Sequence, residues 1–223
     1  MIQVRIWDWP TRIFHWLLAS LVLALVITGN VGGNAMVWHF RCAYAVFSLL
    51  IFRFIWGFCG GHWSRWRQLA CTPELIRQYF KTSAPPAVYL GHNPIGSLSV
   101  IALLALLLLQ VSTGLFSDDE ISNAGPLVSL VAESTVSLAT SWHKGLGKTL
   151  IILLVAVHLL AILWYFLKKK QNLTIAMLKG DKSSEAPAHS SQDGPANWLL
   201  AILCILLSAG LVYALINLGV RAA

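Results

Sequence analysis

Charged side chains are scarce in this sequence, and acidic side chains are the scarcest. Only 11% of the 223 residues are charged, with 9 Asp and Glu against 16 Lys and Arg, whereas 57% are hydrophobic. A typical soluble domain is about 25% charged. The composition therefore argues against an ordinary soluble protein and indicates an integral membrane protein. The formal net charge of +7 leaves nucleic-acid binding open until the positions of the basic residues are considered.

Cysteine is also sparse, and it forms no recognisable metal-binding or redox motif. The four cysteines are scattered and include no CxxC pair. Cys59-Gly-Gly-His62 lacks the second cysteine of the covalent haem motif CxxCH, so covalent haem attachment is not expected. We interpret these cysteines as ordinary thiols within the protein.

Long apolar runs, by contrast, are abundant. About 20 consecutive apolar residues span a bilayer as a helix. The sequence predicts five such segments, at residues 11–29, 37–58, 95–116, 142–167 and 198–218. The polar stretch 181–196 predicts a flexible cytoplasmic linker. We therefore expect an all-α membrane protein with a four-helix core over residues 1–180 and an additional transmembrane helix within 197–223.

The basic residues gather on one side of this predicted topology. The loops 30–36 and 117–141 contain no Lys or Arg. The other side carries Arg5, Arg12, Arg65, Arg67, Arg77, Lys81, Lys168, Lys169, Lys170, Lys179 and Lys182. The positive-inside rule then predicts a cytoplasmic N-terminus, and five crossings place the C-terminus in the periplasm. The basic charge thus reflects membrane topology, and no nucleic-acid partner is expected.

Four of the seven histidines lie in or at the ends of the apolar segments. His143 and His158 belong to the fourth segment, and their spacing corresponds to about 22 Å along a helix and a net rotation of about 60°. They therefore point to roughly the same side. His39 lies level with His143 near the periplasmic face, and His15 lies level with His158 nearer the cytoplasm.

These depths predict two histidine pairs, His39 with His143 and His15 with His158, each drawn from two helices. An ionisable residue inside the membrane indicates function, and helix bundles build cofactor sites from facing helices. A haem takes one axial ligand on each face, whereas zinc normally needs four ligands with cysteine or carboxylate help. The pattern therefore favours two haems.

Nearby basic residues are candidates for contacts with haem propionates. Arg41 and Lys144 lie near the periplasmic level, and Arg53 lies near the cytoplasmic level. Arg53 also fits a second interpretation, in which its side chain snorkels to the membrane interface. Gly29, Gly145 and the following Gly147 suit either the approach of a macrocycle or plain helix packing.

Several motifs in combination resemble the bacterial cytochrome b561 family, which includes the b-type cytochrome subunit of nickel–iron hydrogenases. They are IWDWPTRIFHWLLA, WHFRCAYAVFSLLIFRFIWGFCG, YLGHNPIG, LQVSTGLFSDD and SWHKGLGK. The resemblance extends from about residue 4 to 180. It implies a four-helix core with two b-type haems, whose axial ligands are the pairs His15/His158 and His39/His143.

The resemblance further implies electron transfer in the inner membrane of a bacterium. Electrons would pass between membrane quinone and a periplasmic redox partner, such as a hydrogenase or a c-type cytochrome, with the chain a subunit of, or partner to, a membrane oxidoreductase of the respiratory chain. His92, Arg53 and Trp56 lie near the cytoplasmic face and are candidates for a quinone site, although a loop histidine and interfacial anchors are the favoured explanation. No catalytic residue is expected. The acidic stretch 117–120 suits docking of a basic partner or simple exposure to solvent.

Two other classes of function remain open from the sequence. A transporter with a histidine relay would normally carry intramembrane carboxylates or broken helices, and the apolar runs contain no Asp or Glu. A haem-free membrane anchor subunit would suit the additional helix and the linker, but it leaves the matched histidines without a purpose. A colourless purified protein would favour either of these classes.

Overall fold

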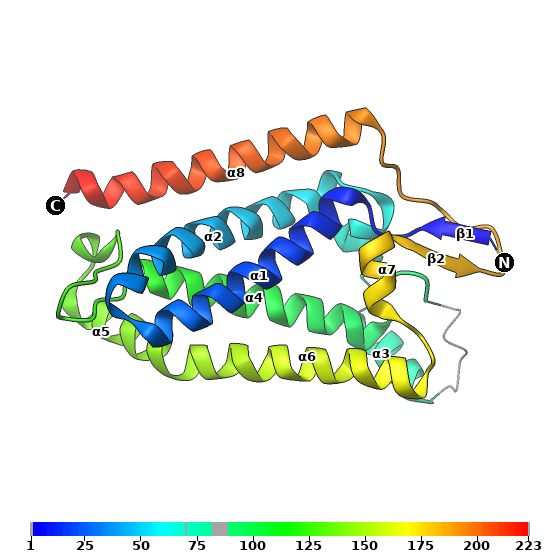
Figure 1. Cartoon of the computed structure of the whole chain (residues 1–223), viewed down its shortest axis with the longest axis horizontal. Coiled ribbons are helices and arrows are strands. Elements are labelled where there is room, and N and C mark those ends of the chain that lie inside the picture. Colours follow the sequence, from blue (N-terminus) through cyan, green and yellow to red (C-terminus); the bar gives the residue numbers. More distant parts are fainter. Residues whose placement is uncertain (1, 70, 82–88, 223) are drawn as a thin grey trace. The chain divides into compact units, whose positions relative to one another are not determined.

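The computed structural model describes residues 2–69, 71–81 and 89–222, and its long helices dominate the chain (Figure 1). They are α1 (Trp9–Val31), α2 (Met36–Cys59), α4 (Pro94–Leu115), α6 (Lys148–Lys168) and α8 (Pro195–Ala222). Over the described residues, five helical stretches are long and apolar enough to cross a membrane. This confirms the predicted all-α, multi-pass class.

Shorter elements connect or precede these helices. They are α3 (Pro73–Lys81), α5 (Glu133–Trp142), α7 (Leu173–Lys179) and the strands β1 (Ile2–Arg5) and β2 (Asp181–Ser184). The two strands pair antiparallel, with Ile2 opposite Ser184 and Arg5 opposite Asp181. Helix α5 was not predicted as a separate element, because all of it except Trp142 lay within the expected loop 117–141.

Side-chain caps explain where several helices begin. The side chain of Asp8 accepts a hydrogen bond from the Thr11 amide in the first turn of α1. The side chain of Asn93 accepts a hydrogen bond from the Gly96 amide in α4, and the side chain of Asn172 accepts one from the Ile175 amide in α7. Such caps satisfy amides that have no partner within the helix.

The chain forms two compact units, each built from three stretches of sequence. The first unit comprises Met1–His15, Arg53–Ala102 and Ala156–Cys204; the second comprises Trp16–Phe52, Leu103–Val155 and Ile205–Ala223. The second unit has an apolar core to which α1, α2, α4 and α6 all contribute. Its buried members are Val46, Leu50, Leu107, Val111 and Ile151, with Leu18, Leu21, Val22 and Leu25 of α1 packed against them. Because four helices share this core, the second unit is a four-helix bundle.

The first unit has a smaller apolar core and a buried carboxylate. Val4, Ile6 and Trp7 are buried together. Next to them, the fully buried side chain of Asp8 accepts hydrogen bonds from the amides of Thr11 and Gly61, the indole of Trp56 and the hydroxyl of Ser64. Four donors to one carboxylate offset the cost of burying its charge.

The stretch 181–196, predicted as a flexible linker, contacts the N-terminal segment at several points. Strand β2 pairs with β1, and Arg5 forms ion pairs with Asp181 and Asp193. The hydroxyl of Ser191 donates to the Ile6 carbonyl at 2.9 Å. Polar side chains of this stretch, whose composition suggested exposure to solvent, form ion pairs and hydrogen bonds with residues near the N-terminus. The predicted domain boundaries themselves stay a prediction.

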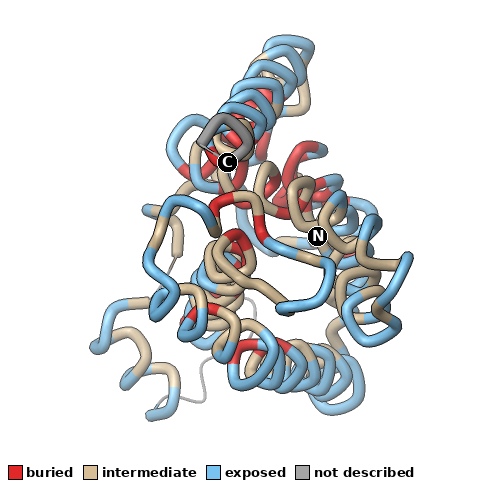
Figure 2. Tube along the Cα trace, turned by 90° about the vertical axis from the view of Figure 1, so that its left-hand side faces the viewer, coloured by how far each residue is buried: buried red, intermediate tan, exposed pale blue. Residues whose placement is uncertain are grey.

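Helix α8 buries one stripe of mostly small residues and leaves large apolar residues exposed. Ala201 and Cys204 are buried in the first unit, and Ser208 and Val212 are buried in the second. The exposed residues include Leu199, Leu203, Leu206, Leu207 and Tyr213. Figure 2 shows buried positions as short stretches among intermediate and exposed ones. Exposed apolar side chains of this kind suit contact with lipid.

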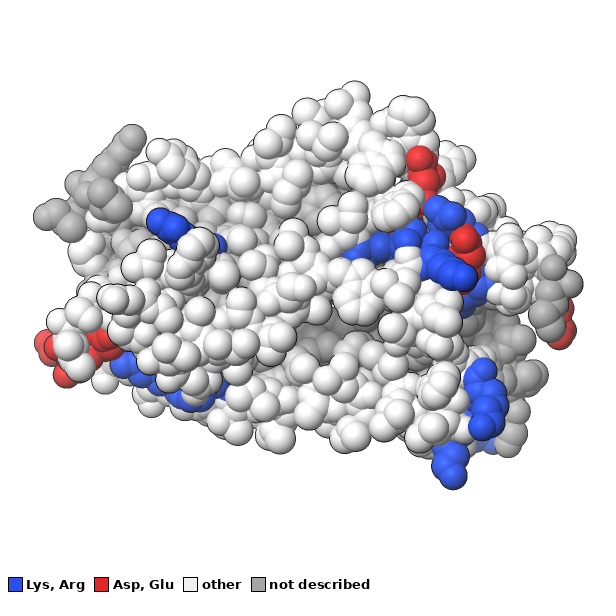
Figure 3. All heavy atoms as spheres, viewed as in Figure 1, with Lys and Arg blue, Asp and Glu red and all other residues white. Residues whose placement is uncertain are grey.

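The charged side chains occupy few places on the surface. Figure 3 shows them in separate groups, with wide uncharged areas between the groups on the face drawn. An uncharged, apolar surface is expected of helices in contact with hydrocarbon, since charge within a bilayer is costly.

Candidate functional site

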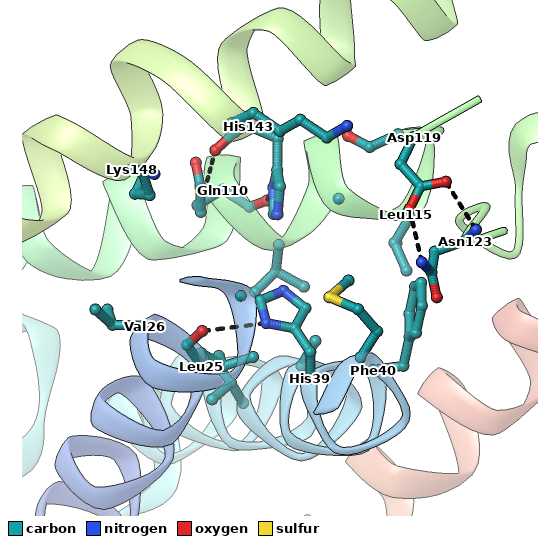
Figure 4. A pocket seen from close by; sticks show the side chains of 18 of the residues that line it. Leu25, Val26, His39, Phe40, Gln110, Leu115, Asp119, Asn123, His143 and Lys148 are labelled. Carbon is teal, nitrogen blue, oxygen red and sulfur yellow. Dashed lines mark hydrogen bonds between the residues drawn. The ribbon is translucent and has the colours of Figure 1, made fainter. Parts of the chain in front are cut away.

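The four membrane histidines form two pairs, one in each unit. In the second unit, the ring centres of His39 and His143 lie 6.2 Å apart with nearly perpendicular planes. Figure 4 shows the two rings directed toward each other across a pocket. In the first unit, His15 lies within electrostatic reach of His158. The structure therefore brings together the pairs that the depth of the residues predicts.

His143 owes its position to an irregular turn. Residues His143–Gly147 form a π-helical turn, η6, between α5 and α6, and Gly145 within it has non-helical angles (φ −102°, ψ −105°). In a π turn the backbone hydrogen bond joins residues i and i+5, one residue further than in an α turn. Such turns often occur at functional sites. The His143 carbonyl in this turn accepts a hydrogen bond from the Gln110 side chain at 2.8 Å.

The two imidazole rings of this pair are held in the same way. The Nδ1–H of His39 donates to the Leu25 carbonyl of α1 at 3.1 Å, and the Nδ1–H of His143 donates to the Gln110 carbonyl of α4 at 2.9 Å. A carbonyl oxygen only accepts hydrogen bonds. Both rings therefore carry their proton on Nδ1 and leave Nε2 as a free lone-pair donor, the arrangement found in most metal-bound histidines.

A glycine lies against each ring, four residues after the carbonyl that the ring contacts. A Cβ at Gly29 would lie 3.0 Å from Cε1 of His39, and a Cβ at Gly114 would lie 2.8 Å from Cε1 of His143. Real Cβ atoms rarely or never come this close to another atom, so any larger residue would push the ring away. Glycine therefore lets each imidazole rest directly on the neighbouring helix.

The two segments that support the histidine rings resemble each other in sequence, and this resemblance was not predicted. The segments LVITG (25–29) and QVSTG (110–114) share Val, Thr and Gly at matching positions. The hydroxyls of Thr28 and Thr113 both donate to the carbonyl four residues earlier, at 2.7 and 3.0 Å. No longer repeat surrounds these two segments, so only a comparison of short segments between helices would have revealed the pattern.

The pair lies in a cavity of about 410 Å³ within the second unit. Its walls are mainly apolar, and cations and anions lie at its edge: Lys144, Lys148, Asp118 and Asp119. Cavities of this size and character bind small molecules and cofactors. Of the residues predicted to contact propionates here, Lys144 lines the cavity. Arg41 does not; it is exposed and lies over the ring of Trp38 at 5.0 Å. Lys148 was not predicted.

An ordered acidic loop borders this cavity. Asp119 accepts hydrogen bonds from the side chain of Asn123 and from the amides of Ile121, Ser122 and Asn123. These four donors, the Asn123 side chain foremost, hold the pKa of Asp119 well below its ordinary value. The loop therefore keeps a negative charge beside the pocket at any physiological pH.

The pair in the first unit has a different setting, with buried cations close by. His92 lies within electrostatic reach of His15, His158 and Arg53, and burial lowers its pKa to about 3. Arg53 is buried and lies over the ring of Trp66 at 4.4 Å. Trp56, the third candidate for a quinone contact, is fully buried and donates to Asp8 at 3.3 Å, which gives it a structural role.

The residues of the second unit fit a haem with two histidine ligands. The ring centres of His39 and His143 lie 6.2 Å apart, and both rings leave Nε2 available because Nδ1–H is bound to a carbonyl. Two imidazoles that face each other in this way are the donor set of a haem with two histidine ligands. A haem held there would supply one-electron redox chemistry.

Comparisons with known proteins agree with this chemistry. The family described as "Prokaryotic cytochrome b561" matches residues 6–180. Relatives named "Probable Ni/Fe-hydrogenase B-type cytochrome subunit" occur in several bacteria. The relative from Rhizobium leguminosarum bv. viciae is 25% identical, over 81% of this chain and 89% of its own length. The relative from Bradyrhizobium diazoefficiens is 21% identical, over 80% and 85%.

A third such relative, from Cupriavidus necator, is 24% identical, over 78% of this chain and 85% of its own length. None of the solved structures gives a significant match to the chain. The family match covers most of the chain, including both histidine pairs. The chain therefore belongs to the prokaryotic cytochrome b561 family, as a multi-pass membrane cytochrome that transfers electrons by means of b-type haem.

Proposed function

We propose that the chain binds two b-type haems, one between His39 and His143 and one between His15 and His158. The observation that carries this proposal is the geometry of the first pair: rings 6.2 Å apart, each with its Nδ1–H committed to a backbone carbonyl. The second pair is supported by its electrostatic proximity and by the buried cation Arg53 nearby. Two haems in series would conduct electrons across the membrane.

We further propose that the electrons pass between membrane quinone and a periplasmic redox protein. The names of the relatives point to a hydrogenase as that partner and to a role as a subunit of, or partner to, a membrane oxidoreductase. The absence of Lys and Arg from loops 30–36 and 117–141 supports a bacterial inner-membrane location with these loops in the periplasm, the N-terminus in the cytoplasm and the C-terminus in the periplasm. The acidic loop around Asp119 would then face the partner. Lys144 and Lys148 at the cavity edge would face the propionates.

The test is a reduced-minus-oxidised absorption spectrum of the detergent-purified full chain, with haem quantified per chain. We expect two b-type haems, both reduced on addition of a quinol. Replacing any one of the four histidines with Leu should remove one haem or change its spectrum. His62→Leu is the matched control, because His62 stacks on His189 and belongs to neither pair.

The possible outcomes separate the alternatives. One haem in the wild-type chain would mean that one proposed pair is wrong. A colourless protein from a host that supplies haem would refute the proposal and favour a haem-free anchor or a histidine-relay transporter.

A further inference from the structure

Arg53 places a positive charge in the interior of the first unit, and part of it has no partner. Its side chain is only 5% exposed. The Nη1 atom is buried and makes no hydrogen bond with any described residue. The contact with Trp66 at 4.4 Å stabilises the guanidinium face but satisfies none of its N–H donors. A buried, unsatisfied donor on a charged group is costly and points to an anionic acceptor at this place.

Lys182 is a second cation in the same unit, although it lies far from Arg53 in the sequence. It lies in β2, and its ammonium donates to the carbonyls of Leu90 and Gly91 at 2.8 and 3.4 Å. The ammonium also lies 6.0 Å from the ring of Trp7. Burial lowers the pKa of Lys182 to about 8. Carbonyl oxygens do not neutralise the ammonium, so this lysine also suits an anion.

His92 connects the two cations to the histidine pair. Its ring lies 4.7 Å from the ring of Trp7, the same ring that Lys182 approaches. Lys182 and Arg53 both lie within its electrostatic reach, as do His15 and His158. The cations, His92 and the candidate haem ligands therefore form one neighbourhood within the first unit.

The carboxylates of the adjoining elements are already engaged. Asp8 accepts four hydrogen bonds from other residues. Asp181 and Asp193 form ion pairs with Arg5. Asp8 lies within electrostatic reach of Arg53, but its oxygens are occupied by these four donors. The unsatisfied Nη1 of Arg53 and the ammonium of Lys182 therefore suit a bound group that presents carboxylate or phosphate oxygens. A haem carries two carboxylates, whereas the other source in a membrane is a lipid phosphate.

We propose that Arg53 and Lys182 bind the propionate carboxylates of the haem held between His15 and His158. This rests on the proposed function, since it requires a haem at that pair. Lysine and arginine form strong charge-assisted hydrogen bonds with carboxylates, and a partly buried setting strengthens them. Strand β2, and through it β1, is thereby tied to the haem site.

The proposal has a measurable electrostatic consequence. Reduction adds one electron, so a nearby cation stabilises the reduced form and raises the midpoint potential. Lys182→Met should therefore lower the midpoint of one haem and leave the other unchanged. We expect a roughly tenfold lower ratio of reduced to oxidised haem at fixed potential, equal to about 59 mV for a one-electron couple.

The experiment is a redox titration of the purified full chain followed by absorption, with haem content measured in the same samples. Lys182→Arg, which keeps the charge, should restore the wild-type midpoint. Lys179→Met is the matched control, because Lys179 is an exposed lysine three positions earlier. Arg53→Gln should lower the same midpoint that Lys182→Met lowers.

Three outcomes are decisive. Two haems with unchanged midpoints in Lys182→Met and Arg53→Gln would overturn this proposal and leave the proposed function intact. A midpoint shift that is absent in lipid-free detergent and appears only when phospholipid is added back would assign the cations to a lipid phosphate, which also overturns it. A wild-type chain without haem would instead refute the proposed function.

Discussion

At the scale of single residues, the site around His39 and His143 depends on groups that are not ligands. The carbonyls of Leu25 and Gln110 fix which imidazole nitrogen carries the proton. A hydrogen bond from the opposite ring nitrogen also raises the basicity of a ligating histidine. Gly29 and Gly114 allow the rings to reach these carbonyls. Orientation and electronic tuning of the pair therefore reside in α1 and α4, although its histidines lie on α2 and η6.

The glycine contact gives a prediction for one methyl group. In Gly114→Ala, the new Cβ would lie 2.8 Å from Cε1 of His143, so the ring must shift and weaken its bond to Gln110. Loss of such support typically costs about 10- to 100-fold in metal affinity. We expect the haem content per chain to fall below that of the wild type, from the proposed two toward one, measured by absorption after purification.

The control for this substitution is Gly210→Ala in α8, where nothing lies within 4 Å of the added Cβ. That variant should keep its full haem content and spectrum. If Gly114→Ala also kept both unchanged, the contact between Gly114 and His143 would not support the ligand.

At the scale of elements, the loop between α4 and α5 is organised around one carboxylate. Asp119 accepts bonds from three amides and one side-chain amide. Its pKa is lowered in the folded protein, so its stabilising effect is fully present above the ordinary value of about 3.9. The effect is lost only as the pH falls through the lowered value.

We therefore expect the loop to keep its hydrogen bonds to Asp119 at pH 4, where an ordinary Asp is nearly half protonated. Hydrogen exchange of the Ile121, Ser122 and Asn123 amides, corrected for intrinsic rates, measures this. Asp119→Ala should raise their exchange throughout the pH range in which the wild-type carboxylate is ionised, because the acceptor is gone. Glu120→Gln is the control that removes a neighbouring charge. Equal protection in Asp119→Ala and the wild type would contradict the assigned role.

At the scale of the whole molecule, α8 is the part whose purpose the histidine pairs do not explain. It buries small residues in both units, and in the second unit Gly219 lies so close to Pro126 that no side chain fits between them. Small residues let helix backbones approach closely in membranes, where packing rather than the hydrophobic effect drives association. In the first unit, the thiol of Cys204 lies within electrostatic reach of that of Cys59 at the end of α2.

This thiol pair predicts a cross-link between two helices. A mild oxidant should join Cys59 and Cys204 in a disulfide within one chain, detected as two thiols that no longer react with a maleimide and by peptide mass. Cys59→Ser should abolish the cross-link, whereas Cys71→Ser should not. Failure of the wild-type pair to cross-link under conditions that oxidise accessible thiols would contradict the docking of α8 on α2.

Much of the architecture could be predicted because the membrane imposes simple rules. The predicted span 37–58 differs from α2 by one residue at each end, and 95–116 differs from α4 by one residue. Helix length follows bilayer thickness, and helices satisfy their own backbone hydrogen bonds. The partners of His15 and His39 followed from helix rise alone. Local composition was therefore sufficient for the spans and for the proposed ligand pairs.

The sequence by itself determined the all-α membrane class, the five spans and the candidate ligands, because hydropathy and helical spacing are local properties. Only the tertiary structure decided what surrounds these ligands. The glycine and carbonyl that support each ring, the burial of Arg53 and the approach of Lys182 to Trp7 all join residues distant in the chain. The stretch 181–196 illustrates why local sequence does not predict such contacts, since its polar residues suit solvent or a partner strand equally well. Only the fold places Arg5 beside Asp181.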